Sequence, residues 1–163
     1  MGHWAAVWWP LAAAVLGGAS APEFVPSGAI ASLRANLRAV RARLRGASGP
    51  EVRVMAVLKS SRGYWLPASP QATARILEDL PEAPDEYAVP GILDAEAVRA
   101  VVPNKSVLVL YPIEPELAPT LAEQRLDVSV SSGTWAEEAS QALRRASPGR
   151  RLGIHLFVDT GHA

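Results

Sequence analysis

The sequence contains no cysteine and carries no net charge, and each absence excludes certain classes of function. Without cysteine the chain has no disulfide framework, no thiolate nucleophile and no cysteine-ligated metal site. Sixteen basic and sixteen acidic side chains cancel, which argues against a general nucleic-acid binder, because such a protein needs a positive field facing the phosphates. With 49% hydrophobic residues among 163, the chain is apolar enough to bury a core.

Lysine and histidine are also scarce. Fourteen of the sixteen basic residues are arginine, which leaves Lys59 and Lys105 as the two lysines of the sequence. Because this chain uses arginine for ordinary surface charge, each lysine raises the question of whether an amine is specifically required, although either can equally be a plain surface charge. His155 lies inside a predicted strand with no second histidine nearby, so we expect no metal site.

Residues 1–25 are interpreted as an N-terminal extension or signal peptide. Residues 4–18 carry no charge and precede small residues at 19–21, as in a secretory signal. However, no lysine or arginine precedes this stretch and Pro10 interrupts it. The stretch is shorter than the about 20 apolar residues that span a membrane. We therefore expect either a cleaved leader, which would make the protein exported or periplasmic, or an extension of a cytoplasmic protein.

From residue 26 onward, helical and strand patterns alternate. Helical spacing covers residues 30–45, 70–80, 94–101, 116–124 and 132–145, and short apolar strands are predicted at 52–58, 87–89, 107–110, 128–130 and 152–158. Asp94 and either Ser132 or Thr134 can cap two of these helices. The arginine-rich face of the first helix is interpreted as solvated surface rather than as an anion-binding patch. This alternation predicts βαβ units in a parallel α/β sheet.

Two architectures fit this alternation, an open doubly wound sheet and a (β/α)8 TIM-type barrel. Neither of the glycine-rich phosphate-binding patterns, GxGxxG and GxxxxGK[ST], follows a predicted strand, which disfavours an open nucleotide-binding sheet. In both architectures ligands bind beyond the carboxyl ends of the strands. The residues that follow the strands are therefore the functional candidates: Lys59, Tyr111, Ser131, Ser132 and the Asp159-Thr160-Gly161 turn.

Lys59 is the leading candidate among them. It follows a dry strand at the expected ligand edge, where an amine can attack a carbonyl and form a Schiff base, which a guanidinium cannot do. Lys105 stands before a strand, at the opposite end of the sheet, where a solvated charge is expected. Asp159 is interpreted first as a carboxylate that orders its own turn and second as a catalytic group.

Six segments stand in the order and approximate spacing found in a known enzyme family: residues 33–41, 56–59, 87–89, 107–110, 130–132 and 155–161. On these segments the chain resembles the N-terminal barrel of the alanine racemases over about residues 30–162. The resemblance implies a pyridoxal 5′-phosphate (PLP) enzyme that interconverts L- and D-alanine, with the cofactor held as an aldimine on Lys59. It also implies a homodimer for the complete enzyme, and neither a metal nor a nucleic acid as partner.

The chain also departs from this family. Gly63 stands where the family has a phosphate-binding tyrosine, and Tyr64, one residue later, is the cofactor-binding residue that the resemblance offers. Phe157 stands where the family commonly has a second lysine. Five strands are too few for a barrel of about 250 residues. We therefore expect residues 26–163 to form a partial barrel that is inactive alone and that aggregates or pairs with another chain through its unpaired edge.

Three functions stay open at this stage. The chain can be part of an alanine racemase, a non-enzymatic PLP-binding homeostasis protein with the same barrel, or a degenerate barrel remnant with a structural role. The Asp-Thr-Gly segment and the Ser131-Ser132 pair favour the racemase. The shifted tyrosine and Phe157 favour the remnant.

Overall fold

The computed structural model describes residues 27–45, 52–59 and 69–161. Residues 1–25, and with them the expected leader, lie outside these ranges. Within the described ranges, no helix is both long and apolar enough to cross a membrane. The elements are α1 (Ser27–Arg45), β1 (Met55–Val57), α2 (Pro70–Glu78), β2 (Glu86–Val89), α3 (Ile92–Arg99), β3 (Val107–Val109), the 3-10 helix η1 (Pro115–Leu117), α4 (Ala118–Glu123), β4 (Asp127–Val130), α5 (Gly133–Ala146) and β5 (Ile154–Leu156).

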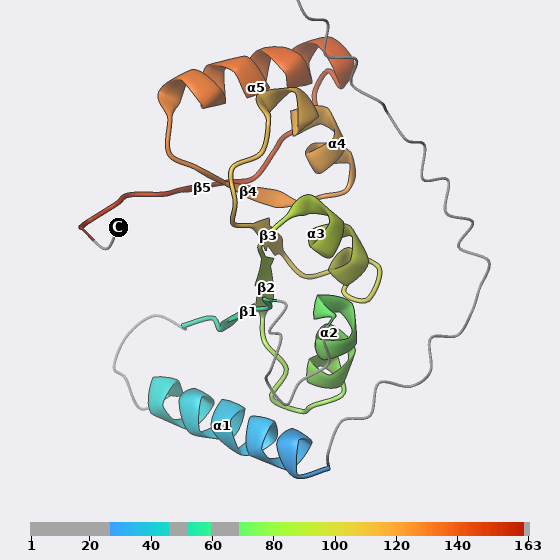
Figure 1. The fold of residues 1–163 in the computed structure, drawn as a ribbon, viewed down its shortest axis with the longest axis vertical. Helices are drawn as coiled ribbons and strands as arrows, with labels where there is room; N and C mark the ends of the chain where they lie inside the picture. Colours follow the sequence, from blue (N-terminus) through green and yellow to red (C-terminus); the bar gives the residue numbers. More distant parts are fainter. Residues whose placement is uncertain (1–26, 46–51, 60–68, 162–163) are drawn as a thin grey trace, which may run out of the picture.

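The five strands form one parallel sheet in the order β1-β2-β3-β4-β5. A doubly wound sheet reverses its strand order at a switch point, whereas a barrel adds each new strand beside the previous one. The unbroken order is therefore that of a barrel segment, and the predicted partial (β/α)8 fold is confirmed. Figure 1 shows α2, α3 and α4 stacked along one side of the strands.

The hydrophobic core lies between the sheet and these helices. Every second strand residue points toward the helices. The strand side chains in the core are Tyr87, Val89, Val107, Val109, Val128 and Val130. Leu77, Val98 and Leu121 meet them from α2, α3 and α4. Each fully buried aliphatic side chain contributes about 1.5–3 kcal/mol relative to its exposed state, so this layer holds the sheet in register.

One of the two predicted helix caps is confirmed and the other is wrong. The Ser132 hydroxyl accepts a hydrogen bond from the Trp135 N–H at 3.4 Å, which decides between the two predicted caps of α5. Asp94 does not cap α3. Gly91 is the cap residue and Asp94 lies in the first turn, where its negative charge still favours the positive end of the helix dipole.

The arginine face of α1 is not simply solvated, contrary to expectation. Its apolar face packs on the core through Ile30, Leu33 and Leu37. Arg38 pairs with Glu82, and Arg41 Nη1 lies 2.7 Å from Asp85 Oδ2. Both carboxylates belong to the loop between α2 and β2, so two arginines fix the helix beside this loop.

The last strand is shorter than predicted and forms an edge of the sheet. Ile154 and Leu156 of β5 are 55% and 76% exposed. The expected apolar edge is therefore present, because no further strand covers β5 in the described part of the chain. Association with another chain through this edge stays a prediction.

Candidate functional site

The register of the sheet places Lys59 on the face away from the helices. Val57 pairs with Ala88, which pairs with Leu108, which pairs with Asp127. The ladder continues past β1, because the Leu58 N–H donates to the Ala88 carbonyl at 2.7 Å. Side chains alternate between the two faces of a sheet. The residues two positions after Val57, Leu108 and Asp127 therefore lie on the same face as these three, at the carboxyl edge of the sheet. This row contains Lys59, Leu110 and Ser129.

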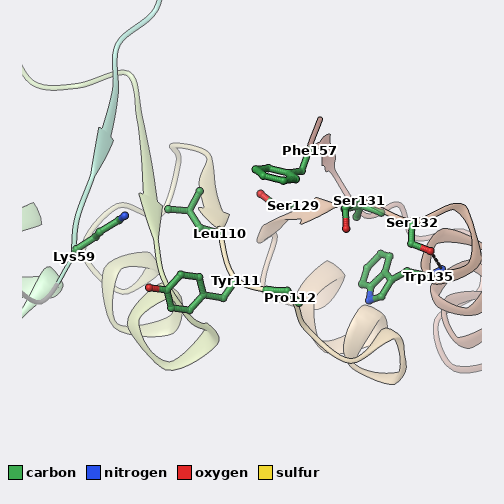
Figure 2. Close-up of a pocket in the computed structure, with 10 residues that line it drawn as sticks. Lys59, Leu110, Tyr111, Pro112, Ser129, Ser131, Ser132, Trp135 and Phe157 are labelled. Carbon is green, nitrogen blue, oxygen red and sulfur yellow. Dashed lines mark hydrogen bonds between the residues drawn. The ribbon is translucent and has the colours of Figure 1, made fainter. Parts of the chain in front are cut away.

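A cavity of about 440 Å³ opens at this edge. Its lining residues are Lys59, Leu110, Tyr111, Pro112, Ser129, Val130, Ser131, Ser132, Trp135 and Phe157. Figure 2 shows Lys59 on one side and the α5 end with Trp135 on the other. Four of the sequence candidates, Lys59, Tyr111, Ser131 and Ser132, therefore come together, with Lys59 as the one charged side chain of this lining. Asp159 does not line the cavity.

Lys59 presents an exposed amine to this cavity. It makes no hydrogen bond or ion pair with any residue that the structure describes. The walls around it are mainly apolar, which is typical of small-molecule sites that orient a ligand with few polar groups. The arrangement offers a primary amine that a carbonyl compound can reach.

Two aromatic side chains of the cavity were not among the sequence candidates. Trp135 lies in the first turn of α5, and its indole Nε1–H donates to the Ile113 carbonyl at 2.5 Å, which fixes the ring. Phe157 follows β5 and its N–H donates to the Val130 carbonyl at 2.8 Å. Phe157 therefore places an uncharged ring in the cavity. The family that this chain resembles commonly has a lysine at this position. The predicted strand at 152–158 includes Phe157, so its position in the sequence was no signal of a place in the site.

The remaining sequence candidates have different outcomes. Asp159 Oδ1 accepts a hydrogen bond from the Gly161 N–H at 2.8 Å, and Gly161 has a φ of 100°. A side-chain oxygen bonded two residues ahead is an Asx turn, so the structure agrees with the turn interpretation. Tyr64 lies outside the described residues, and its cofactor role stays a prediction.

A second polar group lies on the same face, nearer the amino end of the strands. Ser106 donates a hydrogen bond to Asp127, and His155 Nε2 lies 4.0 Å from Asp127 Oδ2. The serine therefore bonds the carboxylate rather than the imidazole, which is not the arrangement of a nucleophilic triad. A Cβ on Gly153 would lie 2.0 Å from Asp127 Oδ1, so glycine lets this carboxylate approach β5. Within the described ranges no cluster of His, Asp and Glu could hold a metal ion.

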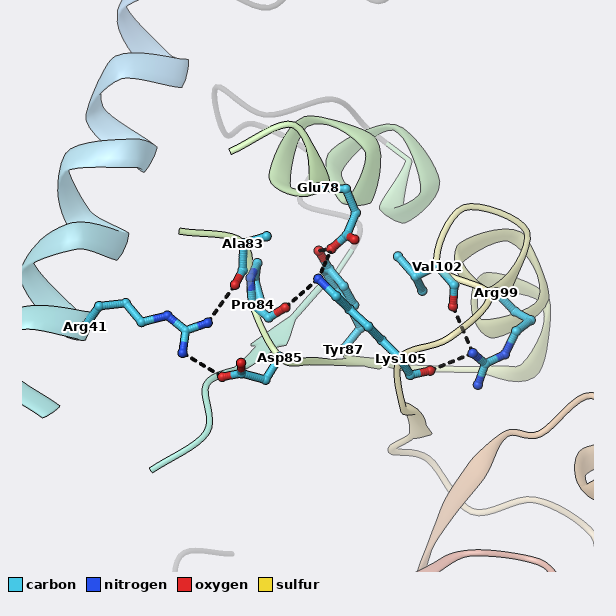
Figure 3. Close-up of polar contacts among 9 residues, drawn as sticks. All are labelled: Arg41, Glu78, Ala83, Pro84, Asp85, Tyr87, Arg99, Val102 and Lys105. Atoms are coloured by element: carbon cyan, nitrogen blue, oxygen red, sulfur yellow. Dashed lines mark hydrogen bonds and ion pairs between the residues drawn. The ribbon is translucent and has the colours of Figure 1, made fainter. Parts of the chain in front are cut away.

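The other lysine has a different environment. Lys105 Nζ lies 2.5 Å from Glu78 Oε1 and donates to the Pro84 carbonyl at 2.7 Å (Figure 3). The Tyr87 hydroxyl donates to the same carboxylate oxygen at 2.6 Å, and burial together with Glu78 raises the pKa of the Tyr87 phenol. The expectation of a solvated Lys105 is therefore wrong, because its ammonium is partly buried and paired.

The comparisons with known proteins agree with this geometry. Residues 29–163 match the family described as alanine racemase, N-terminal domain. Alanine racemases of Levilactobacillus brevis and Lactiplantibacillus plantarum are 41% and 38% identical to this chain over 71 residues, which are 43% of this chain and 19% of each relative.

Solved structures show the same likeness. The alanine racemase of Streptomyces coelicolor A3(2) is 31% identical with a TM-score of 0.62, and the match covers 81% of this chain and 32% of that one. For the enzyme of E. faecalis the identity is 25%, the TM-score 0.64, and the coverage 82% and 33%. The chain thus spans about one third of the length of these solved relatives.

Proposed function

Because the chain belongs to the alanine racemase N-terminal domain family, we propose that it binds PLP through Lys59 and supplies this amine to the racemisation of alanine. The observation that carries the proposal is the position of Lys59. Its amine lies at the carboxyl edge of the sheet, beside a mostly apolar cavity, with no partner among the described residues.

The described lining residues fit the aldehyde and the ring of this cofactor. Lys59 would hold the cofactor through its aldehyde, the group with which a primary amine reacts. Leu110, Pro112 and Val130 offer apolar contact to a flat ring. No second cation for the phosphate is present in this lining, and Tyr64, which the resemblance implicates, lies outside the described residues.

Bound PLP would act as the electron sink for the bond between the α-carbon of the amino acid and its proton. Lys59 is the chain's own acid and base for one face of that carbon. Once the amine of alanine had replaced it on the cofactor, the free Lys59 amine would take the α-proton as the C–H bond breaks, and its ammonium would return a proton to the carbon. The opposite face needs a second acid–base group, which we assign to the homodimer that the resemblance implies.

Phe157 supports a second candidate function, a PLP-binding protein without racemase activity. The phenylalanine ring occupies the cavity where the family commonly has a second cation. A cavity with Lys59 as its one charged lining residue can still hold an aldehyde covalently. It has fewer groups with which to orient a substrate carboxylate.

The cofactor proposal is tested by trapping. The protein is incubated with PLP, reduced with borohydride and digested with trypsin, and we expect a pyridoxyl group on Lys59, in the peptide of residues 54–62. Lys105, in the peptide of residues 100–105, should remain unmodified because Glu78 holds its ammonium. Lys59→Arg should abolish the adduct and the visible absorption of the bound cofactor. Equal labelling of the two lysines would contradict the proposal.

Deuterium exchange separates the two candidate functions. A lysine that acts on the α-carbon exchanges with solvent the α-proton of whichever alanine enantiomer presents it to the amine, even without a base on the other face, so L-alanine and D-alanine are both tested. In deuterated water the PLP-loaded protein should therefore incorporate deuterium at the α-carbon, and Lys59→Arg should not. A protein that forms the Lys59 adduct without this exchange is the carrier and not the racemase.

A further inference from the structure

Tyr87, Tyr111 and Trp135 are the tyrosine and tryptophan residues in the described part of the chain, and two of them are bonded internally. The Tyr87 hydroxyl donates to Glu78 at 2.6 Å, and the Trp135 indole donates to the Ile113 carbonyl at 2.5 Å. The Tyr111 hydroxyl makes no hydrogen bond with a described residue, and the side chain is 58% exposed. Tyr111 therefore keeps a free phenol in the cavity that contains Lys59.

The backbone holds Tyr111 at a fixed place on the sheet edge. The Leu110 N–H donates to the Val89 carbonyl and the Tyr111 N–H to the Pro90 carbonyl, both at 2.9 Å. These bonds tie the end of β3 to the end of β2, which is the strand between Tyr111 and Lys59 in the sheet. In Figure 2 the Tyr111 ring extends from β3 back toward the side of the cavity where Lys59 lies. Lys59 and Tyr111 thus line the same cavity from the two strands that flank β2.

A ligand that fills this space must replace the water around the phenol. Burying a hydroxyl without a partner is unfavourable, so a matching ligand offers an acceptor atom there. Both PLP and the carboxylate of an amino acid carry oxygen acceptors. We propose that Tyr111 is a positioning residue of the Lys59 site, whose phenol donates a hydrogen bond to the molecule that Lys59 holds. This inference rests on the proposed function.

Nitration of tyrosine by tetranitromethane tests the contact without an activity assay, and the absence of cysteine removes a competing target. The three tyrosines fall in separate tryptic peptides, with Tyr64 in residues 63–75, Tyr87 in 76–99 and Tyr111 in 106–125. Tyr87, which is fully buried, is the internal control and should stay unmodified. We expect nitration of Tyr111 to fall several-fold after PLP has been reduced onto Lys59.

Each outcome of this experiment is informative. A Lys59 adduct with unchanged nitration of Tyr111 would overturn the positioning role and leave the proposed function intact. A failure of PLP to modify Lys59 would remove the proposed function and this inference with it.

Substitution of the phenol gives a second measurement. Tyr111→Phe should still form the adduct on Lys59, with an affinity for PLP, or for alanine in the loaded protein, that is about two- to tenfold weaker, the equivalent of one hydrogen bond. Tyr87→Phe is the matched control, because it deletes a hydroxyl at the other end of the sheet and should leave both affinities unchanged. Equal affinities for Tyr111→Phe and the wild type would contradict the role. If Tyr111→Phe does not fold, the nitration of Tyr111 in the wild-type protein still shows whether the bound molecule covers the phenol.

Discussion

The two ends of the sheet use the same residue types in opposite ways. At the amino end, Lys105 and Tyr87 share the Glu78 carboxylate, and the Arg99 guanidinium donates to the carbonyls of Val102 and Lys105 at 2.9 and 2.6 Å (Figure 3). At the carboxyl end, the other lysine and the other described tyrosine face a cavity with no partner among the described residues. The lysine and the tyrosine are thus paired where the strands begin, whereas those where the strands end have no described partner.

The residues that stabilise the fold thus differ from those that are available to bind a ligand. A paired, partly buried charge stabilises the folded chain only as long as its partner is present, because an orphaned partner is costly. An unpaired amine contributes little to folding and stays available for a ligand. In parallel α/β folds ligands bind at the carboxyl edge, so the free groups lie where chemistry is expected. Substitutions at the amino end should therefore lower the free energy of unfolding, whereas substitutions at the carboxyl end should change ligand binding and leave stability almost unchanged.

The largest effect on stability is expected for Lys105→Met. Methionine keeps the apolar stem but removes the ammonium, which leaves Glu78 with the Tyr87 hydroxyl as its remaining partner. We expect a loss of about 1–3 kcal/mol in the free energy of unfolding, measured by urea denaturation. Lys59→Met is the matched control and should change stability by less than about 0.5 kcal/mol. Equal losses for both variants would refute the division between the two ends.

A smaller effect is expected from the ion pair between α1 and the loop before β2. The hydrogen bond from the Arg41 guanidinium is the main cause that holds the pKa of Asp85 below its usual range. Because the pKa is lower in the folded state, this contribution is fully present above the unfolded value of about 4 and is lost as the pH falls through the folded value. Arg41→Gln should reduce stability near neutral pH, by less than about 1 kcal/mol for a partly exposed pair, and flatten the acid side of the profile.

The control for this pair lies on the same helix. Arg43 is exposed and pairs with no described residue. Arg43→Gln should leave the acid-side slope of unfolding free energy unchanged. An unchanged slope in Arg41→Gln would mean that Asp85 is held by its other donor, the Val54 N–H at 2.6 Å.

The sequence was sufficient to predict the strands and the edge where the candidate site lies. Alternation and helical spacing are local signals, and they located all five strands to within a few residues. Because a parallel sheet brings the carboxyl ends of its strands together, position alone predicted that Lys59, Tyr111 and the two serines would meet. Capping was also partly local, as the bond from Trp135 to Ser132 shows.

Tertiary partners could not be predicted in this way. Lys105 pairs with Glu78, 27 residues earlier, and Arg41 with Asp85, 44 residues later. No periodic pattern links such positions, so both cations were interpreted as solvated. Phe157 and Trp135 were missed for a related reason, since an aromatic residue inside a predicted strand or helix is interpreted first as core. Only the register of β4 and β5 shows that the Phe157 ring belongs to the cavity.

The smallest effect is expected for Phe157→Leu, at the carboxyl end. The Phe157 side chain is 59% exposed, so little apolar area is lost when leucine replaces it, and surface substitutions of this kind usually stay within about 0.5 kcal/mol. Urea denaturation should therefore give the wild-type midpoint. A loss as large as that of Lys105→Met would show that the cavity wall belongs to the folding core. An unchanged midpoint would instead leave this wall, like Lys59 opposite it, as surface that is free to take a ligand.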